Sequence, residues 1–243
     1  MKYIENPKTK GSGIVCAIPQ TGKCPNKCDD CFFNEGRSYL EPLEDNLPNV
    51  PEEVHNHQIV RVNDGNDSNV KRGYVLITTK RFPHKFYNTS FNIDLDLYES
   101  PVVLTINPGS MTDINFHKVD PIPKNLMFVR FRVNMWNLWL LKEAVNYYAK
   151  REVPIVLTFM AYYDESSIPT MFKGNYIFRE RTINSYYAIT TESWRRVSRF
   201  WEDTEYDKWV YTCGKIEGER GTTLCRFCGN CIREYHATME RMI

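Results

Sequence analysis

The chain has 243 residues, enough for one large domain or for one domain with an appendage. Its 31 Lys plus Arg against 30 Asp plus Glu give no global basic field that would indicate nucleic acid. Residues 1–13 contain no apolar core of a signal peptide, and no apolar run approaches the roughly eighteen residues of a membrane span. The 8 cysteines fall mostly into two tight groups, which suits metal better than disulfides. We therefore expect a cytoplasmic protein without a membrane partner.

Apolar, β-rich runs alternate with connections that are mostly long enough for crossovers. The expected strands are Gly11–Ile18, Gln58–Asn63, Gly73–Lys80, Pro101–Asn107, Leu126–Asn134 and Val153–Ala161. Between the last two, residues 136–151 place Leu138, Leu141, Val145 and Tyr148 on one stripe of a helix. This pattern predicts an α/β fold built on a parallel sheet.

A turn-rich loop directly after the first expected strand reads KCPNKCDDCFFNEGR. It places Cys24, Cys28 and Cys31 close together, and three thiolates can ligate three irons of one [4Fe-4S] cluster. The fourth iron then stays open for another ligand. The alternative is half of a zinc site, whose paired cysteines normally have two-residue gaps.

The spacing and position of this loop resemble the radical S-adenosylmethionine (SAM) superfamily, and in particular divergent, phage-encoded relatives. The sequence departs from the family at Asp30, where an aromatic residue is usual, while Phe32 and Phe33 follow the third cysteine instead. The resemblance implies a partial (β/α)6-type parallel barrel over residues 1–161. It also implies a [4Fe-4S] cluster, SAM, and a flavodoxin or ferredoxin-like electron donor. Reductive cleavage of SAM would abstract hydrogen from a substrate, with peptide, tRNA and small metabolite all left open.

The loop after the second expected strand occupies the position of the family's Gly-Gly-Glu-like motif. The resemblance implies that it binds the amino group of SAM through Asp64, Gly65, Asn66 and Asp67.

In the expected strand 126–134, Arg130, Arg132 and Asn134 alternate with apolar residues. Because a parallel strand buries both faces, we expect this polar face to line the barrel interior and to bind SAM or substrate, together with Asn107. The alternative is that the arginines face solvent at an incomplete sheet.

Residues 162–204 are expected to cover the barrel and to include a helix that begins after Thr190. In residues 205–243, a short strand at 208–212 leads to Cys213. The expected metal ligands of this C-terminal module are Cys213, Cys225, Cys228 and Cys231. They could hold a second [4Fe-4S] cluster or zinc. If zinc occupies both cysteine groups, the alternative function is a non-catalytic module that binds nucleic acid or protein.

Overall fold

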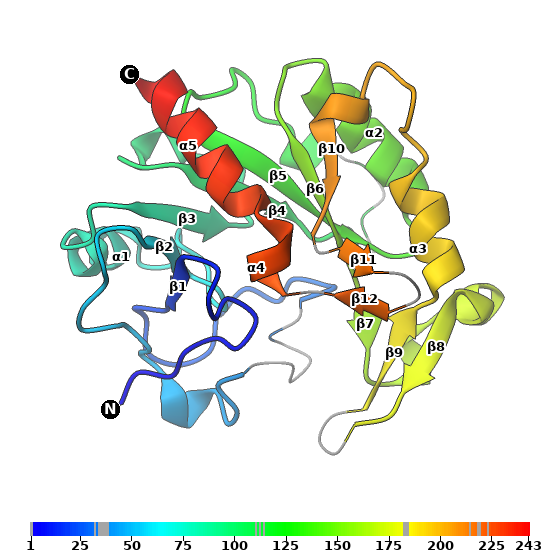
Figure 1. The fold of residues 1–243 in the computed structure, drawn as a ribbon, viewed down its shortest axis with the longest axis horizontal. Helices are drawn as coiled ribbons and strands as arrows, with labels where there is room; N and C mark the ends of the chain where they lie inside the picture. The colour runs from blue at the N-terminus through cyan, green and yellow to red at the C-terminus, as the bar shows by residue number, and fades with distance from the viewer. Residues whose placement is uncertain are drawn as a thin grey trace.

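The computed structural model describes residues 2–31, 33, 39–109, 111, 113, 115–181, 185–213, 215–217, 220–222 and 224–243. Its main feature is a curled half barrel of parallel strands, in the order β1-β2-β3-β4-β5-β6-β10 (Figure 1). The strands are β1 (Ile14–Ala17), β2 (Ile59–Val62), β3 (Lys85–Thr89), β4 (Val102–Ile106), β5 (Leu126–Val133), β6 (Ile155–Phe159) and β10 (Val210–Thr212). The expectation of an α/β fold with a parallel sheet is confirmed.

Three helices cover the outer face of the half barrel: α1 (Arg72–Thr79), α2 (Leu138–Ala149) and α3 (Thr191–Ser198). Alternate strand residues pack against them in the largest core cluster, which includes Val60, Leu104, Val129, Leu141 and Val197. The expected helix at 136–151 is confirmed with slightly shorter bounds. The expected cap is also confirmed, because the hydroxyl of Thr190 accepts a hydrogen bond from the Ser193 amide at 3.2 Å.

The expected strand at 73–80 is wrong, because these residues form helix α1. Their β-branched residues favour a strand locally, but two neighbouring parallel strands need a crossover, and this segment supplies it between β2 and β3. Val75 and Thr79 lie one turn apart and are both buried, and the Thr79 hydroxyl donates to the Val75 carbonyl at 2.7 Å. The strand that sequence analysis missed is β3, a short segment with two polar residues at its end.

The inner face of the half barrel, which α1 to α3 do not cover, packs against the last helix, α5 (Asn230–Met242) (Figure 1). A second core cluster forms there from Ile59, Phe86, Val103, Met127, Phe128, Val156 and Tyr235. Arg241 holds the far end of the helix by donating to the Leu126 carbonyl at 2.7 Å. Because β10 joins the main sheet beside β6, the C-terminal segment shares both a sheet and a core with the rest of the chain.

The remaining elements are small. An antiparallel sheet that the sequence does not predict is formed by β7 (Ala161–Tyr162), β9 (Tyr186–Ile189) and β8 (Tyr176–Arg179). A hairpin of β11 (Lys215–Glu217) and β12 (Arg220–Thr222) precedes helix α4 (Cys225–Cys228). Short 3-10 helices occur at Glu44–Asn46, Leu95–Leu97, Asn115–His117, Glu165–Ser167, Thr170–Asn175 and Asp207–Trp209. In the described part of the chain, every helix is too short or too polar to cross a membrane.

Candidate metal and cofactor site

Several of the predicted site residues lie just after the carboxyl ends of strands. These ends lie at one edge of a parallel sheet, the edge at which α/β proteins bind ligands. The cysteine loop follows β1, the 64–67 loop follows β2, and Asn107 follows β4. Asn134 follows β5, and Cys213 follows β10 at the end of the sheet. The fold therefore gathers residues from both ends of the sequence along one edge.

Asp30 anchors the cysteine loop to this edge. Its buried carboxylate accepts hydrogen bonds from the Gly109 amide at 2.9 Å, from the Asn134 side chain at 2.9 Å and from the Tyr162 hydroxyl at 2.9 Å. These partners follow β4, follow β5 and lie in β7, so one carboxylate joins the loop to three parts of the fold. Asp30, which stands where the resemblance leads us to expect an aromatic residue, therefore fixes the loop to the half barrel.

Two glycines allow the loop to approach the sheet closely. A Cβ at Gly109 would lie 2.0 Å from the Cβ of Asp29, and a Cβ at Gly65 would lie 2.5 Å from the Phe33 ring. No side chain fits at such distances unless the loop moves. Gly65, predicted to bind SAM, thus also has a packing role beneath the cysteine loop.

Gly109→Ala is expected to displace the loop and to lower the free energy of unfolding by roughly 2 kcal/mol, because the added methyl overlaps Asp29 at a positive φ of 36°. Iron uptake at the loop should fall with it, which iron analysis after reconstitution would measure. The matched control is Gly174→Ala, where an added Cβ meets nothing within 4 Å. Equal stability and iron content in both variants would contradict the proposed close contact.

The three loop cysteines are partly buried and lie near one another. Burial raises the pKa of Cys24 to about 11, and nearby Asp67, Cys28 and Cys31 add to the rise. Burial also raises the pKa of Cys28, whose sulfur lies 3.7 Å from the Ser90 hydroxyl. Metal binding must therefore displace protons from these thiols. Phe32 lies outside the described residues, as do residues 34–38.

The carboxylates of the 64–67 loop already have protein partners. Asp67 accepts hydrogen bonds from Thr89 Oγ1 at 2.7 Å and from the amide and hydroxyl of Ser90 at 2.6 and 2.8 Å. Asp64 pairs with Arg61 at 2.5 Å, and Asn66 donates to the Gly22 carbonyl at 3.5 Å. These bonds fix the 64–67 loop beside the cysteines. Its binding to the amino group of SAM stays a prediction.

Asn134 is fully buried, and its side chain forms hydrogen bonds with other groups of the protein. Its amide donates to Asp30, while its side-chain oxygen accepts from the backbone amides of Trp136 and Asn137 at the start of α2. Asn107 is partly buried after β4. A cofactor role for either residue stays a prediction.

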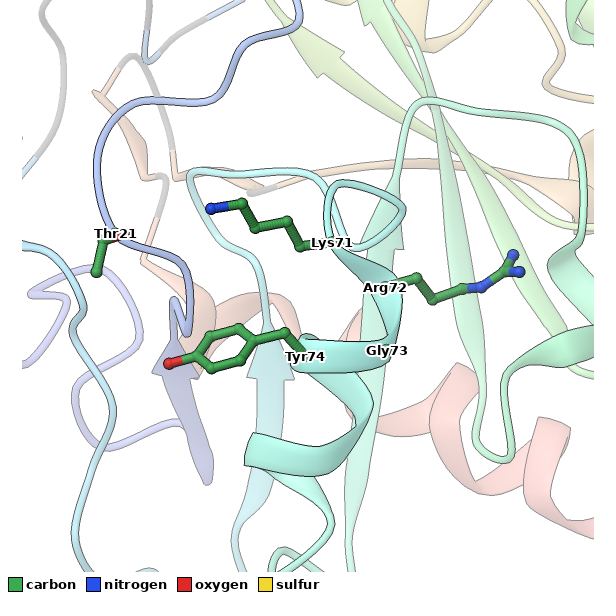
Figure 2. Close-up of a pocket in the computed structure, with 5 residues that line it drawn as sticks. All are labelled: Thr21, Lys71, Arg72, Gly73 and Tyr74. Carbon is green, nitrogen blue, oxygen red and sulfur yellow. The ribbon is translucent and has the colours of Figure 1, made fainter.

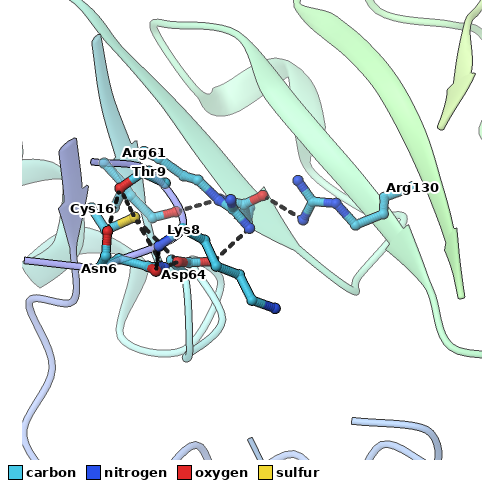
Figure 3. Close-up of polar contacts among 9 residues, drawn as sticks. Asn6, Lys8, Thr9, Cys16, Arg61, Asp64 and Arg130 are labelled. Atoms are coloured by element: carbon cyan, nitrogen blue, oxygen red, sulfur yellow. Dashed lines mark hydrogen bonds and ion pairs between the residues drawn. The ribbon is translucent and has the colours of Figure 1, made fainter. Parts of the chain in front are cut away.

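Arginines line the inner face, as the strand alternation predicts. Arg130 is buried and donates to the side-chain oxygen of Asn88 at 2.9 Å, and burial together with the charge of Arg61 lowers its pKa. Burial, with the charge of Arg130, lowers the pKa of Arg132 to about 9. Arg61 lies beside Asp64, Cys16 and Asn6 in a buried polar cluster (Figure 3). The inner face therefore concentrates positive charge next to both cysteine groups.

The C-terminal cysteines lie beside the same arginines. The Cys213 amide donates to Leu157 at 2.7 Å, and the Cys225 amide donates to Lys8 at 2.9 Å. Burial raises the pKa of Cys225 to about 12 and that of Cys231 to about 11, while Arg61 lowers both. In each case Cys213 contributes to the rise, so the described thiols lie within electrostatic reach of one another.

No group of three or more His, Cys, Asp or Glu among the described residues is gathered tightly enough to hold a single metal ion. Thiolates ligate both zinc and iron–sulfur clusters, so the cysteine donors of the two groups suit either kind of centre.

A hollow of about 520 Å³ lies beside the start of the cysteine loop and is lined by Thr21, Lys71, Arg72, Gly73 and Tyr74. In Figure 2 the side chains of Lys71 and Tyr74 extend towards Thr21, whereas that of Arg72 extends away from it. Lys71 and Arg72 bring positive charge to the hollow, although Arg72 pairs with Asp94 at 3.0 Å. Sequence analysis missed it because it placed residues 73–80 in a strand, whereas they form a helix that begins beside the loop.

Sequence analysis also missed how the N-terminal segment is attached. Asn6 donates to the Asp64 carboxylate at 2.5 Å, and Tyr3 donates to the Cys16 carbonyl at 2.9 Å. The buried, β1-based Cys16 donates to the same carboxylate at 3.1 Å. An apolar strand gives no signal of such a partner 48 residues away.

Comparisons of this chain with protein-family models, with curated proteins and with solved structures find no match.

Proposed function

We propose that the protein is a radical SAM enzyme in which Cys24, Cys28 and Cys31 hold a [4Fe-4S] cluster. The observation that carries the proposal is the placement of the cysteine loop. It follows the first strand of a parallel half barrel, and Asp30 fastens it to the carboxyl edge of β4 and β5. Three neighbouring thiols beside a buried, arginine-rich inner face are suited to a cluster with one open iron.

The cluster, when bound, would supply the electron that cleaves SAM into methionine and a 5′-deoxyadenosyl radical able to abstract hydrogen from a C–H bond. The protein's contribution is position and exclusion of water. Asp30 fixes the loop, Gly65 and Gly109 permit its close approach, and α5 closes the inner face below the arginines. SAM would lie near Arg130 and Arg132 at the carboxyl edge.

In this proposal the half barrel corresponds to the partial (β/α)6-type barrel of the superfamily, extended by β10. The chain would work in a reducing cytoplasm with a flavodoxin or ferredoxin-like electron donor. A zinc-binding interaction module is the second candidate. The loop favours it less, because its three cysteines are separated by gaps of three and two residues instead of forming the two pairs usual for structural zinc.

The test is anaerobic purification, reconstitution with iron and sulfide, and an assay for 5′-deoxyadenosine after addition of SAM and a chemical reductant. We expect a brown protein that releases 5′-deoxyadenosine. A colourless protein that binds zinc stoichiometrically, or an iron-loaded protein that leaves SAM intact, would contradict the proposal.

A further inference from the structure

Two arginines on the inner face carry buried charge that the surrounding protein balances only in part. Arg61 pairs with Asp64 at 2.5 Å, but its Nε is buried without a hydrogen-bond partner. Arg130 is 5% exposed, and its described hydrogen bond goes to the neutral side chain of Asn88. The charge of Arg61 also lowers the pKa of Arg130, after the larger effect of burial. Burial of such cations is costly unless an anion lies beside them.

The sheet register brings the C-terminal cysteines to Arg130. Val156 of β6 pairs with Arg130 on one side and with Tyr211 of β10 on the other. Cys213 comes two residues after Tyr211, and alternation along a strand therefore returns it to the same face. Cys213 and Cys231 pack against the core cluster that contains Phe128, and the guanidinium of Arg130 lies 5.6 Å from that ring.

A chain of hydrogen bonds leads from the same cysteines to Arg61. The Cys225 amide donates to the Lys8 carbonyl, and the Lys8 amide donates to Asn6 Oδ1 at 2.9 Å. Asn6 donates to Asp64, which pairs with Arg61 (Figure 3). Thiolates at Cys225 and Cys231 would raise the pKa of Arg61, and thiolates at Cys213 and Cys231 would raise that of Arg130.

We propose that Arg61 and Arg130 form the positive seat of an anionic metal–thiolate centre that Cys213, Cys225, Cys228 and Cys231 hold on the inner face of the half barrel. Four thiolates carry more negative charge than an iron–sulfur core neutralises, so the loaded centre would supply an anion for Arg130 and a second one for Arg61, which already pairs with Asp64. The inference rests on the proposed function only for assigning these cysteines to a cluster. In this proposal Arg61 and Arg130 are positioning residues. The second centre would lie inside the fold, with Arg61 and Arg130 between it and the cysteine loop.

The first test measures iron retention in the full chain, in a background in which Cys24, Cys28 and Cys31 are replaced by alanine. After reconstitution, Arg130→Met is expected to speed the loss of iron to a chelator by about 10- to 100-fold, the range for residues that support a metal's ligands. Arg130→Lys, which keeps the charge, should retain most of the iron. Equal loss from the Lys and Met variants, or none from either, would overturn the proposal.

A second measurement remains informative if Arg130→Met folds poorly with the centre loaded. In a chain whose four C-terminal cysteines are serine, the counter-charge is gone, and Arg130→Met should leave thermal stability unchanged or raise it. With the cysteines intact and loaded, the same change should lower thermal stability. Equal effects in the two backgrounds would show that Arg130 acts independently of the centre and would overturn the proposal.

These readouts are separate from SAM chemistry. If the wild-type chain retains C-terminal iron in the pattern described but does not cleave SAM, the proposed function fails and this inference stands. If replacing Cys213 and Cys228 with serine leaves the iron content of the loop-deficient background unchanged, the inference fails, whatever the outcome of the SAM assay.

Discussion

Replacing Cys24, Cys28 and Cys31 together with alanine is expected to abolish 5′-deoxyadenosine formation and to remove about half of the bound iron, if both cysteine groups hold clusters. The loop has three cysteines where the C-terminal group has four, so under the proposed function it is the loop that would leave an iron open for SAM. Its cysteines are partly exposed at the carboxyl edge, and their removal leaves the anchor at Asp30 intact. Iron analysis and product chromatography on the same sample would measure both effects.

Cys16→Ser is the matched control for this triple replacement. Cys16 is a fully buried thiol outside both groups, bonded to Asp64. A serine hydroxyl can donate to the same carboxylate, so this variant should keep the iron of both centres and its SAM cleavage. Cleavage that persists in the triple variant would remove the basis for assigning the loop to the catalytic cluster.

Asp30→Ala is expected to lower the free energy of unfolding by roughly 3 kcal/mol, because it leaves the Gly109 amide, the Asn134 amide and the Tyr162 hydroxyl without their buried acceptor. Asp30 also has a positive φ of 55°, which alanine tolerates less well than aspartate. The loop should lose its fixed position, so SAM cleavage should fall further than iron content. Denaturant unfolding, iron analysis and a SAM assay would measure the three effects.

Two neighbouring variants separate these causes. Asp30→Asn keeps the size and the tolerance for positive φ but retains one acceptor oxygen, so it should cost roughly 1 kcal/mol. Lys27→Ala changes an exposed side chain of the same loop and should leave stability nearly unchanged. If Asp30→Ala and Lys27→Ala unfold at the same denaturant concentration, Asp30 is not the anchor of the loop.

The parts of the fold that the sequence predicts are those with strong local patterns. The apolar runs at β4, β5 and β6 and the amphipathic stripe of α2 mark their own structure. The segment 73–80 has the β-branched residues of a strand but folds as a helix, because parallel pairing of β2 and β3 requires a crossover there. The structure of this segment is determined by the pairing of strands that are distant in sequence, and a short stretch of sequence carries no information about that pairing.

The residues of the candidate site likewise include some that the sequence predicts and others that it does not. Cysteine spacing identifies the groups of possible ligands, and strand alternation identifies the inward face of Arg130. Asp30 gives no comparable signal, because its three partners lie 79, 104 and 132 residues further along the chain. The sequence likewise predicts a strand before Cys213 but not its position beside β6, which brings the second cysteine group to the arginines.

The covering of the inner face by α5 has a consequence for synthesis on the ribosome. Strands β1 to β6 emerge first, but Ile59, Phe86, Val103, Phe128 and Val156 stay open to water until Ile232 and Tyr235 have been made. Such a surface on a nascent chain is a target for chaperones and a risk for aggregation. Cys231 lies at the start of the same helix, so the four ligands of the proposed second centre would not come together before this helix has been made.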